Sequence, residues 1–194
     1  GPDDYHRTAG RHEYSLAPPA PTQLDALAGA CLDVIAVGKI YDIFAGRGIT
    51  EKIPSANNNE GMEVALALAG RHFEGLAFIN LVDFDMVYGH RNDVDGYAAA
   101  LSDFDVALGV FMQKMCPQDV LIITADHGCD PSTPSTDHSR ENVPILAYGA
   151  PVRRGADLGT RRSFSCIASS IAEYFELTKR FAAPSFWPLV AAEK

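Results

Sequence analysis

The sequence predicts an α/β fold in which a largely parallel sheet is flanked by helices. Short apolar runs that read as buried strands alternate with segments whose apolar residues recur at helical spacing. Carboxylate and imidazole side chains collect where these runs end, and ligands of parallel α/β sheets bind at the carboxyl ends of strands. A chain of 194 residues is long enough for one sizeable core, so a single domain is the default expectation.

The chain begins with a segment that has no apolar periodicity. Residues 1–22 are polar and then proline-rich, which is typical of a loop or an extended linker. A helix is expected over residues 22–27, with Thr22 as its N-cap and Asp25 at the capping-box position. The apolar run 33–38 then predicts the first buried strand.

Lys39 directly follows this strand and precedes a glycine-rich loop. A lysine in this place is a reasonable contact for an anion, although a solvated surface lysine fits the position equally well. Residues 50–59 are expected to form a polar loop. Residues 61–71 have the spacing of a helix with one apolar face.

The second half of the chain continues the alternation of strand and helix. The run 75–82 ends in Asp83-Phe84-Asp85 and is followed by His90. The run 120–123 leads into Asp126-His127-Gly128, in which the glycine permits a tight turn. The other predicted elements are a long amphipathic helix over 94–115, a strand over 143–149 with Pro144 at its start or at a sheet edge, and a helix over 165–175.

The composition limits the possible partners. The chain is 47% hydrophobic and 21% charged, which is ordinary for a globular protein. Its net charge of −9 argues against nucleic acid or an anionic membrane as a partner, and no apolar run approaches the roughly 18 residues that span a bilayer.

No signal peptide opens the chain, and the four cysteines lack metal-site spacing, so a cytoplasmic protein with reduced thiols is expected. The oligomeric state is not indicated.

Five side chains at the predicted strand ends form a candidate metal site. Carboxylates at the end of a buried strand are normally paired or bound to a metal, although one Asp-His pair alone fits a solvated loop equally well. Mixed carboxylate and imidazole ligands suit Mn²⁺, Zn²⁺ or Fe²⁺ better than Ca²⁺, and two such ions can clamp a phosphoryl group. The candidate ligands are Asp85, His90, Asp126, His127 and His138.

Several stretches of the chain resemble the phosphopentomutase family of the alkaline phosphatase superfamily. The Asp126-His127-Gly128 motif alone indicates only the superfamily, whereas the stretches 85–90 and 136–141 are specific to the mutase. The resemblance implies an alkaline-phosphatase-like core, and it covers most of the chain through residues 7–15, 37–46, 80–91, 124–128, 136–141 and 158–161.

The resemblance also implies a reaction and a role for each candidate residue. The reaction interconverts ribose 1-phosphate and ribose 5-phosphate, or the deoxyribose pair, through a phosphothreonine on the enzyme. Cations stabilise the charge of a phosphoryl group in transfer. Lys39 would contact the substrate phosphate. Two Mn²⁺ ions would be bound, the first by Asp126 and His127 and the second by Asp85, His90 and His138.

The chain departs from the family pattern in ways that bear on activity. Family members are longer, and their nucleophilic threonine, a further aspartate ligand and most of the substrate-binding cap belong to a part that this chain does not match. Residues 1–17 are therefore expected to be the end of the cap domain and its hinge, and residues 18–194 the metal-binding α/β core. Gly10 stands where the family usually has asparagine, and Cys166 stands where it has aspartate.

Three functional interpretations follow. The first is a portion of an active phosphopentomutase that is inactive by itself. The second is another member of the superfamily, such as a cofactor-independent phosphoglycerate mutase or a phosphatase, against which the Lys39 loop and residues 88–91 argue. The third is a truncated, catalytically inactive protein that binds metal or nothing.

Overall fold

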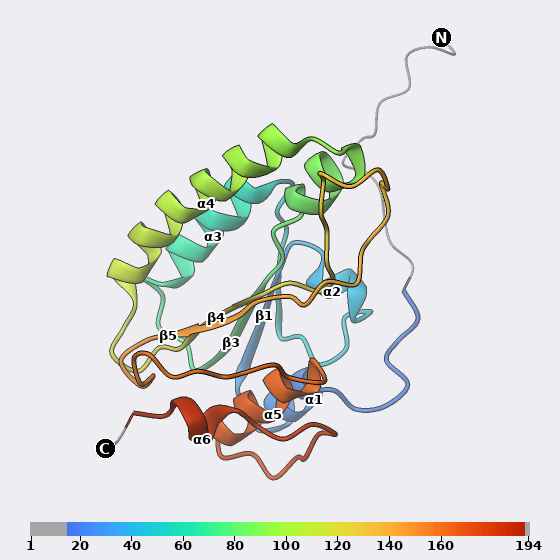
Figure 1. Ribbon diagram of the computed structural model, residues 1–194. Helices are drawn as coiled ribbons and strands as arrows, with labels where there is room; N and C mark the ends of the chain where they lie inside the picture. The colour runs from blue at the N-terminus through green and yellow to red at the C-terminus, as the bar shows by residue number, and fades with distance from the viewer. Residues whose placement is uncertain (1–14, 193–194) are drawn as a thin grey trace.

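The predicted alternation of strands and helices is present in the structure, a computed structural model that describes residues 15–192 (Figure 1). The strands are β1 (Asp33–Val37), β2 (Glu51–Ile53), β3 (Gly75–Ile79), β4 (Leu121–Thr124) and β5 (Ile145–Tyr148). The helices are α1 (Gln23–Gly29), α2 (Ile40–Ile43), α3 (Asn58–Leu68), α4 (Val94–Lys114), α5 (Ser165–Tyr174) and α6 (Trp187–Val190), with a π-helical turn η1 (Phe84–Tyr88) and a 3₁₀ turn η2 (Gly89–Arg91) before α4.

Strand β1 is the centre of a three-stranded parallel sheet in the order β2-β1-β3. Its residues Val34–Val37 are fully buried, because both faces of the strand are covered. Val34 packs with α1 and α5, whereas Ile35 and Val37 pack with α3. This alternation follows from the two-residue side-chain period of a strand and confirms the predicted α/β fold with helices on both faces of a parallel sheet.

Strands β4 and β5 form a separate antiparallel pair, with Leu121 opposite Tyr148 and Thr124 opposite Ile145. Strand β5 begins immediately after Pro144, in agreement with the expectation that the proline stands at a strand start. The pair packs against α5 and α6 through a cluster centred on Cys166, Phe186 and Val190.

Local structure differs from the sequence prediction at several places. The predicted polar loop 50–59 contains strand β2, which is only three residues long and gives little apolar signal. Helix α3 begins at Asn58 instead of residue 61, because Asn57 accepts a hydrogen bond from the Glu60 N–H and acts as the N-cap. Two short helices were not predicted. Helix α2 directly follows Lys39 along the chain, and helix α6 lies near the C-terminus.

Residues 1–14 lie outside the described part of the chain. The predicted end of a cap domain over residues 1–17 therefore remains a prediction, and so does the role of the stretch 7–15. Among residues 15–192, no helix combines the length and the apolar character that crossing a bilayer requires.

Asp25 anchors the start of α1. Its Oδ2 accepts from the Thr22 N–H at 2.5 Å, and its Oδ1 accepts from the Arg47 Nε at 2.9 Å. Arg47 also donates to the Pro18 carbonyl, so one carboxylate ties the segment before α1 to the loop after α2. Burial acts to raise the pKa of Asp25, but the bonds from Thr22 and Arg47 outweigh this effect and hold the pKa below its usual value.

We expect Asp25→Asn to lower the free energy of unfolding by about 1–2 kcal/mol at pH 7, because the ion pair with Arg47 is lost and the Thr22 N–H donates to a neutral oxygen in place of a carboxylate. A lowered folded-state pKa stabilises the protein above the unfolded pKa of about 3.9, and this contribution disappears as the pH falls through the folded value. The difference between parent and variant should therefore shrink below about pH 4. Urea unfolding at pH 7 and pH 3.5 measures this difference in the free energy of unfolding. Asp105→Asn, which removes an exposed carboxylate, is the control. Equal differences at the two pH values would contradict the assignment.

Candidate metal centre

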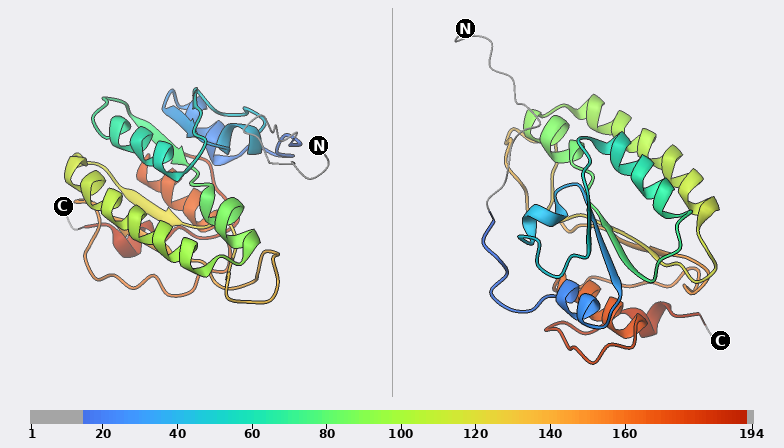
Figure 2. Two further views of the ribbon diagram at one scale, coloured as in Figure 1. Left: turned by 90° about the horizontal axis from the view of Figure 1, so that it is seen from above. Right: turned by 180° about the vertical axis from the view of Figure 1, so that it is seen from behind.

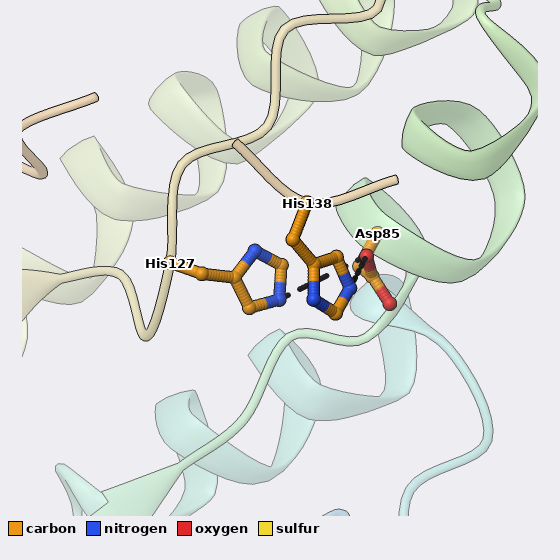
Figure 3. Close-up of side chains that lie close together, drawn as sticks. All are labelled: Asp85, His127 and His138. Atoms are coloured by element: carbon orange, nitrogen blue, oxygen red, sulfur yellow. Dashed lines mark hydrogen bonds and ion pairs between the residues drawn. The ribbon is translucent and has the colours of Figure 1, made fainter. Parts of the chain in front are cut away.

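The turns that follow β3 and β4 bring four of the candidate ligands together. The π-helical turn after β3 carries Asp85, and the 3₁₀ turn behind it carries His90. His127 lies just after β4, and His138 lies in the long loop between β4 and β5. Figure 3 shows the rings of His127 and His138 side by side and facing Asp85, which comes from the other side of the site.

One carboxylate oxygen is the common centre of these side chains. Asp85 Oδ1 lies 3.2 Å from His138 Nε2, 3.3 Å from His90 Nε2 and 3.9 Å from His127 Nε2. The rings of His127 and His138 stack with centroids 3.6 Å apart, and the His90 ring lies 5.0 Å from that of His138. Three imidazoles therefore present the same ring nitrogen to one oxygen.

Backbone carbonyls determine which nitrogen of two of these rings carries the proton. The Thr136 carbonyl lies 2.6 Å from His90 Nδ1, and the Gly128 carbonyl lies 3.1 Å from His127 Nδ1. A carbonyl oxygen only accepts, so each Nδ1 is the donor and each neutral ring keeps its Nε2 lone pair toward Asp85. This arrangement, with a backbone acceptor on the far nitrogen, is the usual support of a metal-binding histidine.

The donor set fits a divalent transition metal. Ligand distances of about 2.1 Å place neighbouring ligand atoms about 3.0–3.4 Å apart, close to the separations of His90 and His138 from Asp85. One ligand atom from each of Asp85, His127 and His138 lies within 4.8 Å of the others. The Nε2 lone pairs of neutral His90 and His127 rings repel the Asp85 carboxylate oxygen, and a cation among them removes that repulsion, whereas His138 Nε2 lies within hydrogen-bond distance of the same oxygen.

Asp126 lies at the outer side of this group. Its carboxylate is 76% exposed, and its Oδ1 lies 3.7 Å from His127 Nε2. The family resemblance implies that His127 and Asp85 bind different ions, yet His127 Nε2 is nearly as close to Asp85 as to Asp126. His127 thus stands between the two predicted ligand groups.

Lys39 follows β1 at the sheet edge where β3 also ends, since Val37 is paired with Ile79. Its backbone carbonyl accepts from the Ile43 N–H, so it begins helix α2. The structure places Lys39 at the predicted edge of the sheet, and its contact with a phosphate remains a proposal.

Two glycines bring the site loops close enough for these contacts. Gly128 and Ser139 form an isolated antiparallel bridge, which holds His127 beside His138. A Cβ on Gly128 would lie 2.9 Å from the Ser139 carbonyl oxygen and 2.5 Å from Glu141 Oε2. A Cβ on Gly89 would collide with the Cys129 sulfur, so Gly89 lets the turn after β3 approach the loop after β4.

Further contacts fix the long loop that carries His138. Asn92, in the left-handed conformation that ends the 3₁₀ turn, donates from Nδ2 to the Thr133 carbonyl at 2.5 Å. Together with the bond from His90 to Thr136, this attaches the loop to the segment that carries Asp85. Sequence reasoning missed Asn92 and Thr136, because contacts to backbone carbonyls leave no residue pattern.

Two neighbours of the ligands have structural roles. Asp83 Oδ2 accepts from the Asn58 N–H, while the Asp83 N–H donates to Asn58 Oδ1, so Asp83 joins the end of β3 to the start of α3. Burial raises the pKa of the Cys129 thiol, and the Asp85 carboxylate adds to the rise. A neutral thiol packed against Gly89 agrees with a space-filling role for Cys129.

Comparison with known proteins identifies the family. A family model described as the metalloenzyme superfamily matches residues 6–179. The chain belongs to this superfamily. A phosphopentomutase of Lachnoclostridium phytofermentans is 58% identical over 94% of this chain and 47% of its own length. A phosphopentomutase of Carboxydothermus hydrogenoformans is 52% identical over 96% of this chain and 48% of its own length. The chain thus spans about half the length of these curated relatives, and the predicted resemblance to phosphopentomutases is confirmed.

We expect Gly128→Ala to weaken the binding of a divalent metal ion at least tenfold, because the added methyl group pushes the His138 loop away from His127. Titration calorimetry with Mn²⁺ measures the affinity. Gly109→Ala is the matched control, since a Cβ at Gly109 meets nothing within 4 Å, and an alanine there should stabilise α4 by about 0.5–1 kcal/mol. Unchanged affinity in Gly128→Ala would show that the bridge does not position the ligands.

Proposed function

We propose that this chain forms the metal-binding part of a phosphopentomutase, which interconverts ribose 1-phosphate and ribose 5-phosphate or the deoxyribose pair. The observation that carries the proposal is the convergence of three imidazole Nε2 atoms on Asp85 Oδ1. The names of the similar proteins supply the substrate class, a pentose phosphate.

Two Mn²⁺ ions are the proposed cofactors. His127 with Asp126 would hold one ion, and Asp85 with His90 and His138 would hold the other. The position of His127 Nε2, 3.7 Å from Asp126 Oδ1 and 3.9 Å from Asp85 Oδ1, supports two neighbouring sites. When bound, two such cations neutralise charge on a phosphoryl group in transfer.

The residues of this chain would orient the ions and the substrate. The carbonyls of Thr136 and Gly128 accept from Nδ1 of His90 and His127, so that in the neutral rings the Nε2 lone pairs are directed into the site. Lys39, at the sheet edge shared by β1 and β3, would bind the substrate phosphate through its ammonium group.

The proposed reaction also needs a nucleophilic threonine, which the family carries in the part that this chain does not match. Thr124, which ends β4, and Thr136, whose carbonyl accepts from His90, stand in the wrong part of the family pattern to be that nucleophile. We therefore propose that the 194 residues bind Mn²⁺ but do not turn over pentose phosphates by themselves. A cytoplasmic location is proposed from the absence of metal-site or disulfide spacing among the cysteines.

Loss of a ligand should abolish most of the Mn²⁺ binding. We expect Asp85→Ala and His138→Ala each to lower the affinity by more than about tenfold, because the carboxylate is the common centre of the group and His138 lies nearest to it. Calorimetry measures the affinity, with the exposed His72→Ala as a control for loss of an unrelated imidazole. If both variants bind Mn²⁺ with the affinity of the parent, the assignment of Asp85 and His138 as metal ligands is wrong.

A chimera tests the reaction itself. This chain would replace the matching 47% of the Lachnoclostridium phytofermentans relative, and conversion of ribose 1-phosphate to ribose 5-phosphate would be assayed with Mn²⁺. We expect mutase activity that Asp85→Ala removes and His72→Ala retains. Robust hydrolysis of an aryl phosphate without mutase activity would instead favour a phosphatase.

A further inference from the structure

The loop that carries His138 is long and has little burial of its own. This His138 loop, residues 129–142, lies between β4 and β5 and forms no helix, and its residues 134–138 are all exposed. Both views of Figure 2 show it at the edge of the molecule, beside the turns that precede α4. A segment with few buried contacts has low local stability, so its position depends on a small number of hydrogen bonds.

Within residues 15–192, three side-chain hydrogen bonds attach the His138 loop to the segment that follows β3. In chain order, they join Asp85 to His138, His90 to the Thr136 carbonyl, and Asn92 to the Thr133 carbonyl. The first two belong to candidate metal ligands. Asn92 is therefore the member of the three that can hold the loop without itself belonging to the ligand set.

Asn92 makes this contact at a cost to local stability. The Thr133 carbonyl only accepts, so the amide must present Nδ2 to it. This leaves Asn92 Oδ1 buried and without a hydrogen-bond partner in the part of the chain that the structure describes. The backbone of Asn92 is also left-handed, with φ 53° and ψ 34°. Unfavourable local features of this kind persist where the surrounding structure requires them, and they cluster at functional sites.

Asparagine is the residue type that this position requires. The Asn92 N–H donates to the Gly89 carbonyl and closes the turn that carries His90, which needs a residue that tolerates a positive φ. Glycine would meet that need and remove both unfavourable features, but it has no side-chain donor. Aspartate has the same shape, but its ionised carboxylate only accepts and would face the Thr133 carbonyl.

We propose that Asn92 is a positioning residue of the metal centre, which ties the His138 loop to the turns of Asp85 and His90 before an ion binds. It acts through the Thr133 carbonyl and brings His138 into place, and it lowers local stability in doing so. This role rests on the metal centre of the proposed function. It goes beyond that function in assigning the orientation of the loop to a side chain outside the ligand set.

Asn92→Gly should move metal affinity and stability in different directions. We expect the Mn²⁺ affinity measured by calorimetry to fall at least about fivefold, the size of one hydrogen bond. The midpoint of urea unfolding of the metal-free chain should stay at or above that of the parent, because glycine adopts the left-handed conformation freely and leaves no buried orphan oxygen. A residue that only supports the fold would lower both quantities together, and that result would overturn the proposal.

Glu176→Gly is the matched control. Glu176 is exposed, has a φ of 55° and follows α5, which Figure 1 shows at the end of the molecule opposite the turns that precede α4. Glycine there relieves the same backbone conformation far from the metal centre, so the Mn²⁺ affinity should equal that of the parent. An affinity loss as large as that of Asn92→Gly would assign the effect to glycine in general and refute the role of Asn92.

Hydrogen exchange of the metal-free chain tests the attachment without any ion. The Thr133 N–H donates to the Asp130 carbonyl and the Ser139 N–H donates to the Gly128 carbonyl, so both amides report on the closed loop. In Asn92→Gly and in Asn92→Asp these amides should exchange at least about fivefold faster than in the parent. Unchanged exchange in both variants would show that Asn92 does not hold the loop.

The two measurements separate this proposal from the proposed function. A parent chain that fails to bind Mn²⁺ would refute the metal centre, and the positioning role of Asn92 would fall with it. A parent that binds Mn²⁺ together with an Asn92→Gly variant of equal affinity would leave the metal centre standing and refute the role of Asn92 alone.

Discussion

The convergence of three imidazole nitrogens on one carboxylate oxygen is the constraint on which the functional end of this molecule depends. Asp85 Oδ1 lies 3.2–3.9 Å from the Nε2 atoms of His138, His90 and His127. Two of these rings are held by backbone carbonyls with the lone pair directed inward. His138 Nε2 is within hydrogen-bond distance of this oxygen, but the lone pairs of neutral His90 and His127 rings repel it unless a cation or an added proton lies between them, so the surrounding structure must hold these two rings in place.

That holding structure is made of contacts between segments that are far apart in the sequence. The bridge between Gly128 and Ser139 aligns the two loops that carry His127 and His138. Asn92 and His90 attach the longer loop to the turn behind β3 through backbone carbonyls. Main-chain hydrogen bonds therefore hold the candidate ligands in orientation, in the way that outer contacts orient the ligands of metal sites.

The strands beneath the site belong to two separate sheets. Strand β1 is covered on both faces and flanked by β2 and β3, and it forms the best buried element of the described chain. Helix α5 packs against both groups of strands, since Ile171 contacts the cluster of Val34 and Cys166 the cluster that contains Ile122 and Ile145. The candidate metal centre thus lies where two groups of strands meet, because Asp85 follows β3 and His127 follows β4.

The sequence by itself determined the α/β class, the order of most elements and the choice of candidate ligands, because apolar runs, helical spacing and polar strand ends are local patterns. It gave no indication of strand β2 or of the antiparallel direction of β5, since short strands and strand direction depend on distant partners. It also separated His127 from Asp85, which the structure brings within 3.9 Å of each other. Only the tertiary structure decided that proximity, because it results from loop contacts at Gly89, Gly128 and Thr136 that no spacing along the chain encodes.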